Sequence, residues 1–363
     1  MHTSLDLESK SLIEQTLRRF LADCYDPVAR HQRLSAHTLD YREHWATLAQ
    51  LGVLALTFDE VFGGLGASHR DLADAIRVLA PGLILEPFVE AAVVAGSVLA
   101  AGTNPGTRAA CIERLVDASR VTVLAGGHDA QCGRLRCERT TEGLRLTGAL
   151  RVVPYAAQAD EWLVVAQEAL GEPLIVRIDA ARSQAKLSEY RLMDGRPAAD
   201  LVFEDERVAL TELWLEGEAA RSALHDARLG AINALCAEAV GVMEALIATT
   251  GEYLRTRTQF GAPLATYQAL QHRYVDMYMA YIESSAISRE FADMLGSGNR
   301  EALPKLAFSA ALVVEKASCL VGHEAIQMHG GIGVTDELMV SHDNARLNVI
   351  TSMLRNWRPE WKS

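Results

Sequence analysis

The residues best suited to hold a cofactor lie in the last third of this 363-residue chain. The segment QMHGGIGVTDE, which begins at Gln327, places Gly330 and Gly331 at the end of an apolar helical pattern. Glycine lets another molecule approach the backbone because no Cβ intervenes, and a helix end leaves backbone polar groups free to bond. This segment therefore favours a binding turn.

A second candidate group precedes that turn, in RTQFGAPLATYQ, residues 257–268. The guanidinium of Arg257 is permanently charged and forked, so it suits a bidentate contact with a phosphate better than a lysine does. Phe260 and Gly261 also fit a plain turn between two helices, and the two interpretations are compatible. Arg257 would therefore suit a ligand that carries phosphate, if the chain binds one.

Residues that could act as an acid, a base or a metal ligand are less clearly indicated than these binding residues. The predicted helix after the glycine turn, residues 343–357, has no carboxylate beyond its first residue. His329 is expected to be a hydrogen-bonded structural residue, because no set of ligands at zinc spacing accompanies it. Cys132 and Cys137 also lack a second pair of ligands. We predict no metal site.

The spacing of apolar residues predicts the elements that position these side chains. Helical periodicity dominates residues 1–115. Short segments rich in β-branched residues follow over 116–217 and predict a β sandwich or barrel of about six to eight strands. Helical periodicity returns over 218–363 and predicts a four-helix bundle. The expected fold class is α+β, mainly α, with these three domains.

Some element boundaries have a specific signal. Ser68, with Asp71 three residues later, predicts a capping box at a helix start. Pro304 and Gly330 predict the first turn and the end of another helix. The stretch 274–282 is almost entirely apolar, so we expect it to be buried in the bundle or in a subunit interface.

Composition excludes several classes of function. The net charge of −12 argues against a cationic surface for nucleic acid or anionic membranes. No run of about 18 apolar residues predicts a membrane span, and the N-terminus lacks the basic and apolar regions of a signal peptide. Cysteine is used as in proteins of a reduced compartment. We therefore expect a cytoplasmic protein without membrane insertion or nucleic-acid binding.

The order of a helical, a β and a second helical region, together with RTQFGAPLATYQALQHRYVDM and QMHGGIGVTDE, resembles the acyl-CoA dehydrogenase family. The resemblance spans nearly the whole chain and includes VFGGLGAS at 61–68 and LTGALRVVPYAAQADEWLVVA at 146–166. It implies FAD and an acyl-CoA bound between the β domain and the bundle. It also implies dimers or dimers of dimers, and an electron-transferring flavoprotein as electron acceptor.

By this resemblance, a set of residues in the bundle forms a clamp for FAD across a subunit contact. The R-x-x-F-G motif reaches the FAD of a neighbouring subunit, and the Q-x-x-G-G backbone approaches the adenosine side of FAD. The positions of this chain that match the clamp are Arg257, Phe260, Gln268, Gln327, Gly330 and Gly331.

The same resemblance exposes a missing base. Removal of a proton from Cα of an acyl-CoA normally needs a carboxylate. The two positions that supply this glutamate in the family hold Leu354 and Ala231 in this chain. Glu238, the nearest acid on the same helix face as Ala231, lies about 10 Å further along the axis. On the flavin side, Pro154 replaces a hydroxyl residue and VLAGGHDAQCG, residues 123–133, replaces a motif that lines FAD and acyl-CoA.

Retention of the clamp with loss of the flavin-ring side predicts a noncatalytic subunit of a heteromeric FAD-dependent acyl-CoA dehydrogenase. Relatives of this kind pair with a catalytic subunit as α2β2 heterotetramers, and some act on CoA thioesters of steroid side chains. One alternative is a self-sufficient homomeric enzyme whose base is Glu238 or Glu337. Another is a nonenzymatic binding relative without FAD, against which Arg257, Gln268 and Gln327 argue.

Overall fold

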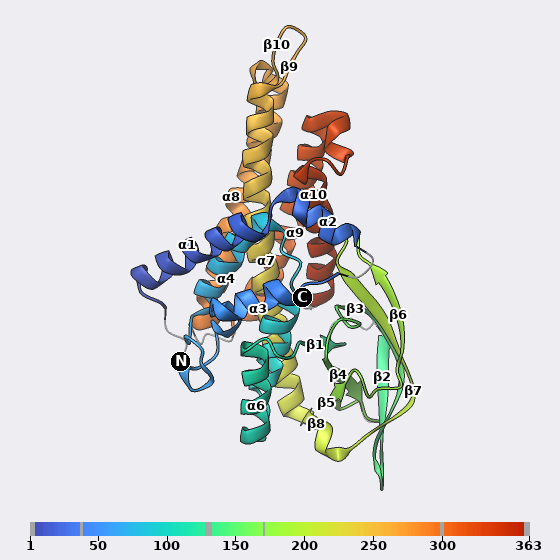
Figure 1. The fold of residues 1–363 in the computed structure, drawn as a ribbon. Helices are drawn as coiled ribbons and strands as arrows, with labels where there is room; N and C mark the ends of the chain where they lie inside the picture. The colour runs from blue at the N-terminus through green and yellow to red at the C-terminus, as the bar shows by residue number, and fades with distance from the viewer. Residues whose placement is uncertain (1–3, 37–38, 128–132, 170, 298–300, 359–363) are drawn as a thin grey trace. The chain divides into compact units, whose positions relative to one another are not determined.

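The chain folds into two compact units in the computed structural model (Figure 1). The first unit comprises Arg33–Ala67 and Leu85–Ala231, and the second comprises His2–Gln32, Ser68–Ile84 and Ile232–Ser363. The long helix α7 (Gly217–Thr256) contributes to both. The structure describes all residues except 1–3, 37–38, 128–132, 170, 298–300 and 359–363.

The first unit combines short helices with a β-sheet. Its helices are α3 (Arg42–Gln50), the π-helix Phe88–Ala95, α5 (Gly96–Ala100) and α6 (Pro105–Val116). Its strands are β1 (Thr122–Ala125), β2 (Gly133–Thr140), β3 (Gly143–Pro154), β4 (Glu161–Gln167), β5 (Pro173–Asp179), β6 (Lys186–Arg191), β7 (Pro197–Val208) and β8 (Leu213–Glu216). In β2, buried Leu135 and Cys137 alternate with exposed charged residues, as the pleat of a half-buried strand requires.

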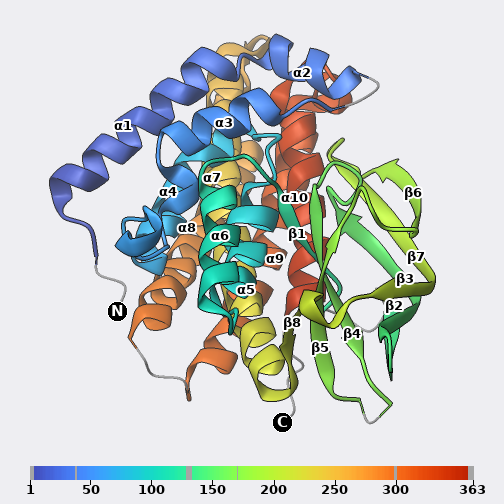
Figure 2. The same cartoon turned by 60° about the horizontal axis from the view of Figure 1, so that its bottom comes forward.

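The strands form one 8-stranded sheet in the order β6-β7-β3-β2-β4-β5-β8, and β1 pairs with β4. A single residue pair, Arg136 with Gln167, links β2 to β4, so two better-paired parts of the sheet meet there. Figure 2 shows the part with β2, β3, β6 and β7 curving towards β4 and β5. Trp162 of β4 and Phe203 of β7 meet edge to face with ring centroids 6.5 Å apart. The two parts therefore enclose a common apolar core, which agrees with the predicted sandwich or barrel.

The second unit is helical. Its elements are α1 (Leu7–Cys24), most of α2 (Pro27–Ser35), α4 (His69–Leu79), the second half of α7, α8 (Gln268–Gly296), α9 (Leu303–His329) and α10 (Met339–Trp357). The last four of these helices form the predicted bundle, and Figure 1 shows α7 and α8 as long neighbours.

Local sequence signals explain where several helices of the second unit begin and end. The Ser68 side chain accepts from the Asp71 backbone N–H, and Asp71 returns a bond to the Ser68 backbone. This confirms the predicted capping box. Pro304 lies in the first turn of α9, and Gly330, with φ of 65°, follows its last residue. The last helix begins at Met339, a turn earlier than the sequence predicted.

One face of α8 differs from its predicted burial. Val275, Tyr278, Met279 and Ile282 are 53, 48, 52 and 42% exposed. They recur at helical spacing, so together they form one outward apolar surface, which we call the α8 stripe. Burial of these four residues inside the bundle was therefore a wrong prediction. Their burial in a subunit interface stays a prediction.

Two helices also qualify, by length and composition alone, as membrane spans, contrary to the expectation from the sequence. They are α7 and the segment Leu303–Val334. In α7, 83% of the apolar window is buried inside the fold. A helix that is apolar on all sides is also what a protein core requires, so the composition of α7 is weak evidence for a membrane.

Candidate functional site

The R-x-x-F-G segment forms a projecting hairpin in the second unit. Helix α7 leads through Arg257 into β9 (Thr258–Gln259), which pairs with β10 (Ala262–Pro263). The two residues between these strands, Phe260 and Gly261, have φ of 54° and 84°. Positive φ at both positions is the geometry of a tight two-residue hairpin turn, which glycine adopts freely and phenylalanine only with strain.

The hairpin holds an aromatic ring in solvent. Phe260 is 84% exposed, although its backbone is strained. The Tyr267 hydroxyl lies 3.1 Å from the Gln259 carbonyl oxygen and 3.4 Å from that of Phe260, and it donates to them. Gln268, the first residue of α8, follows Tyr267 directly. Strain at an exposed aromatic residue is typical of a binding position rather than of internal packing.

Helix α9 brings the glycine turn to the same end of the bundle. The rings of Tyr253 in α7 and His329 in α9 stack with centroids 4.3 Å apart and 28° between their planes. The Tyr253 hydroxyl donates to the His329 carbonyl oxygen over 3.3 Å. His329 directly precedes Gly330, and Tyr253 lies about one helical turn before Arg257. The Arg257 and Gly330 segments, distant in sequence, therefore lie at one end of the second unit.

The clamp residues are open to a ligand from outside the chain. Arg257, Gln268 and Gln327 are exposed. Among the residues that the structure describes, no carboxylate pairs with the Arg257 guanidinium. A Cβ on Gly330 or Gly331 would meet no atom within 4 Å. Because Gly331 does not have a positive φ, neither backbone conformation nor internal packing explains its missing side chain. These residues are therefore accessible to a ligand from outside the chain.

His329 has the structural role that its sequence context predicted. Its Nδ1 lies 2.8 Å from the Ala325 carbonyl oxygen, and burial lowers the pKa of the imidazole despite this bond. The described part of the chain has no group of three or more His, Cys, Asp or Glu side chains arranged to hold a metal ion. Cys132, one of the two cysteines considered for zinc, lies outside the described residues.

Neither family position of the base can accept a proton. Ala231 in α7 and Leu354 in α10 are both 0% exposed. Each is an apolar side chain packed inside its own unit, so a carboxylate introduced there would lose its hydration unless a partner compensated it. At both positions the chain therefore has a buried apolar side chain instead of a carboxylate.

Glu238, the alternative base, is committed to an ion pair. Its two carboxylate oxygens accept from Nε and Nη2 of Arg346 at 2.7 and 2.6 Å. The two side chains are 7% and 1% exposed. A bidentate guanidinium contact stabilises the charged carboxylate and occupies the lone pairs that a base would use. Glu238 therefore joins α7 to α10 and is poorly suited to remove a proton from a substrate.

The remaining positions considered for the chemistry are Glu337, Pro154 and the altered VLAGGHDAQCG motif. Glu337 is exposed in the segment between the short helix 330–334 and α10. Pro154 ends β3, opposite Ala198 of β7, and it has neither an N–H nor a hydroxyl to donate. Residues 128–132 of the altered VLAGGHDAQCG motif lie outside the described residues.

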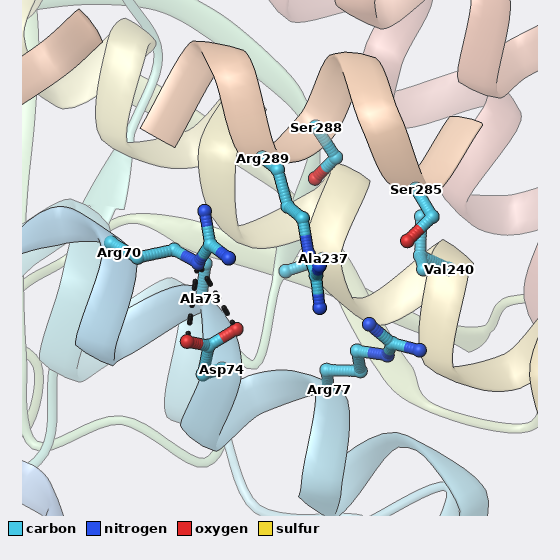
Figure 3. Close-up of a pocket in the computed structure, with 9 residues that line it drawn as sticks. All are labelled: Arg70, Ala73, Asp74, Arg77, Ala237, Val240, Ser285, Ser288 and Arg289. Atoms are coloured by element: carbon cyan, nitrogen blue, oxygen red, sulfur yellow. Dashed lines mark hydrogen bonds and ion pairs between the residues drawn. The ribbon is translucent and has the colours of Figure 1, made fainter. Parts of the chain in front are cut away.

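A separate pocket lies between α4, α7 and α8 of the second unit (Figure 3). Arg70 pairs with Asp74 at 3.1 Å and Arg77 pairs with Glu244 at 2.7 Å. Arg289 points into the same space from α8. The free volume is about 20 Å³, which accommodates about one water molecule. This pocket shares no residue with the clamp and is too small for an acyl chain.

Comparison with known families assigns the fold. Residues 8–117 match the family model described as acyl-CoA dehydrogenase, N-terminal domain, and residues 216–352 match the one described as acyl-CoA dehydrogenase, C-terminal domain. The chain belongs to the acyl-CoA dehydrogenase family. Both parts of the clamp, Arg257 to Gln268 and Gln327 to Gly331, lie within the second match.

One protein of similar sequence and two solved structures of similar fold are compared with this acyl-CoA dehydrogenase family member. Acyl-CoA dehydrogenase IpdE2 of Mycobacterium tuberculosis is 25% identical over 334 residues, which cover 91% of this chain and 88% of that protein. The ChsE4-ChsE5 complex from Mycobacterium tuberculosis contains a chain with a TM-score of 0.87 and 21% identity, with coverage of 97% and 95%. The Tcur3481-Tcur3483 steroid ACAD variant gives a TM-score of 0.83 and 23% identity, with coverage of 96% and 94%.

The family is one of FAD-dependent oxidoreductases that act on acyl-CoA thioesters, and further solved structures with this fold contain FAD or FADH2. FAD is thus the cofactor of this family, and Arg257, Gly330 and Gly331 lie within the C-terminal family match.

Sequence reasoning missed the residues that support the site. Arg346, the partner of Glu238, lies 108 positions away in the chain, so no local pattern connects them. Tyr253 and Tyr267 lie four residues before Arg257 and one before Gln268. The available signal is an aromatic residue beside each clamp motif, but a tyrosine at such a position does not by itself indicate a supporting role.

Proposed function

We propose that this chain is the noncatalytic, FAD-clamping subunit of a heteromeric acyl-CoA dehydrogenase that introduces an α,β double bond into an acyl-CoA thioester. The observation that carries the proposal is an asymmetry. The clamp residues are exposed and open, whereas Ala231 and Leu354 fill both base positions with buried apolar side chains.

Each clamp residue has a defined task in this proposal. The Arg257 guanidinium binds the pyrophosphate, and Gln268 and Gln327 donate hydrogen bonds to the cofactor. Gly330 and Gly331 admit the adenosine side because nothing in the chain fills the space beside them. FAD held by these residues would supply the acceptor for the hydride lost from Cβ of the substrate. The carboxylate that takes the Cα proton comes from the catalytic subunit.

The partner in this proposal is a catalytic acyl-CoA dehydrogenase subunit, in an α2β2 heterotetramer. The α8 stripe supports a large subunit contact, since apolar surface removed from water contributes about 25 cal/mol per Å². Val275 and Ile282 lie seven and fourteen residues after Gln268, so the stripe continues the helix face that begins at the clamp. The ChsE4-ChsE5 complex, whose fold this chain shares, is itself heteromeric.

The substrate class in the proposal is a steroid side-chain CoA thioester. It rests on the similarity in fold to the Tcur3481-Tcur3483 steroid ACAD. An electron-transferring flavoprotein would take the electrons from the active complex, and the complex would work in the cytoplasm. The acyl group is tested by comparing the turnover of the complex on steroid and straight-chain acyl-CoA thioesters.

The test of the subunit role uses this chain in two forms. The chain is expressed alone, and together with a candidate catalytic subunit of the same family from the same organism. The proposal predicts a pair that co-purifies with bound flavin and whose turnover is lost when the partner's carboxylate is removed. A homo-oligomer of this chain that oxidises an acyl-CoA would instead establish the self-sufficient enzyme. A folded chain that binds no flavin in either form would establish the nonenzymatic relative.

A further inference from the structure

The Tyr253–His329 pair joins the two halves of the clamp. Tyr253 lies in the last turn of α7, and His329 is the last residue of α9. The rings stack at 4.3 Å, and the Tyr253 hydroxyl donates to the His329 carbonyl oxygen. That carbonyl is one of the last acceptors of α9, which have no partner within their own helix. Tyr253 thus supplies a hydrogen-bond donor to the C-terminal end of α9 and also holds that end against α7.

The protonation of His329 is fixed by its neighbours. The Ala325 carbonyl oxygen, 2.8 Å from Nδ1, can only accept a hydrogen bond, so Nδ1 carries the proton. Burial, to 4% exposure, is the main cause of the lowered pKa. Burial therefore favours the neutral ring, which lies against Tyr253 as an uncharged aromatic surface. The donation to Ala325 and the stack together determine one orientation of the ring.

The position of the glycine turn follows from this orientation. Gly330 leaves α9 with φ of 65° and ψ of −143°, a conformation open only to glycine, and it follows His329 directly. Arg257 lies four residues beyond Tyr253. A shift of the His329 ring would therefore move the glycine backbone relative to the guanidinium. Both must meet the same dinucleotide if it is to bind tightly.

We infer that His329 and Tyr253 are positioning residues for FAD: their stack sets the distance between the phosphate contact at Arg257 and the adenosine contact at Gly330 and Gly331. The inference rests on the proposed FAD clamp. It adds two residues that act through the clamp residues next to them. Because the pair is preformed in this chain, binding does not need to order it.

The test is a titration of FAD into the complex after its flavin has been removed, with absorbance as the readout. His329→Asn keeps a donor for the Ala325 carbonyl and removes the stack, whereas His329→Phe keeps the stack and removes the donor. Tyr253→Leu and Tyr253→Phe separate the stack from the hydroxyl in the same way. His323→Asn, on an exposed position of α9, is the matched control.

We expect the two stack-breaking variants, His329→Asn and Tyr253→Leu, to raise the FAD dissociation constant about threefold to tenfold. His329→Phe and Tyr253→Phe should recover most of the affinity, and turnover at saturating FAD should stay near that of the unmodified complex. If the pair has only a structural role, the variants should lose more thermal stability the smaller the replacing side chain. Their FAD dissociation constants should then stay close to that of the unmodified complex. If His329→Asn does not fold, the Tyr253 variants decide alone.

An unchanged dissociation constant in the folded stack-breaking variants would overturn the inference, provided that the unmodified complex binds FAD. Failure of the proposed function has a different signature, because the unmodified complex then holds no flavin or this chain is active alone. In the latter case the same titration is carried out on the homo-oligomer, and the positioning role is judged there independently of the subunit role.

Discussion

The buried ion pair between Glu238 and Arg346 gives the sharpest test of whether this chain holds a base. Both oxygens of Glu238 are engaged at 2.7 and 2.6 Å, and the side chains are 7% and 1% exposed. Removal of one member of a buried pair typically costs about 3–5 kcal/mol, because the other charge stays buried without its opposite. Glu238→Ala should lower the free energy of unfolding by about this amount.

A matched control lies on the same helix. Glu244 pairs with Arg77, but its side chain is 52% exposed. Surface pairs contribute about 0–1 kcal/mol, so Glu244→Ala should change the free energy of unfolding much less than Glu238→Ala. Urea denaturation of the purified complex or chain measures both. The double variant Glu238→Leu with Arg346→Met should recover most of the loss, because neither charge of the pair is then left buried without its partner.

The catalytic readout of the same site uses Glu238→Gln, which keeps the shape of the side chain and removes its basicity. The ion-pair account predicts that the folded Glu238→Gln complex turns over acyl-CoA at close to the unmodified rate. Loss of turnover by about a hundredfold or more, with the free energy of unfolding unchanged, would identify Glu238 as a general base and refute the reasoning.

Three further predictions concern the clamp and a buried acid. Arg257→Ala should weaken FAD binding by the complex about tenfold to a hundredfold. Arg255 lies two residues away and pairs with Glu252, so Arg255→Ala should leave FAD binding unchanged. Equal effects of the two substitutions would show that Arg257 makes no specific contact with the phosphate. Gly331→Ala should leave the stability of the chain alone unchanged, since a Cβ meets nothing within 4 Å, yet weaken FAD binding; unchanged affinity in the titration would contradict the close approach. Burial raises the pKa of Asp343 to about 7. Between about pH 4 and pH 7 the folded chain therefore binds more protons than the unfolded chain, and its free energy of unfolding falls as the pH rises through this range. Asp343→Asn should remove this slope and be the more stable form at pH 8, as urea denaturation at several pH values would measure; a parallel decline in both forms would exclude Asp343 as its source.

The sequence predicted the features that depend on neighbouring residues. The capping box at Ser68 and the end of α9 at Gly330 were correct because their signals lie within one helical turn of the boundary. The position of the clamp in the helical C-terminal region followed in the same way. Its motifs are short, and each requires a specific residue type for a physical reason, such as the missing Cβ of Gly331.

The remaining features depend on contacts between distant residues. Arg346 neutralises Glu238 across 108 positions, and the sequence alone left Glu238 open as a base. The exposure of Met279 could not be read from composition, since an apolar helix has the same sequence whether its partner is in the same chain or in another. In the β domain, β1 pairs in parallel with β4 and β3 pairs with β7, which no local periodicity specifies.

The central claim is that this chain clamps FAD for a partner that holds the base. Its most direct test is the flavin absorbance and native mass of this chain expressed alone and with a candidate catalytic subunit from the same organism, followed by acyl-CoA turnover of each species. The account predicts a yellow, active heterotetramer, and a chain that alone is colourless and inactive. A yellow homo-oligomer of this chain that oxidises an acyl-CoA without a partner would contradict it.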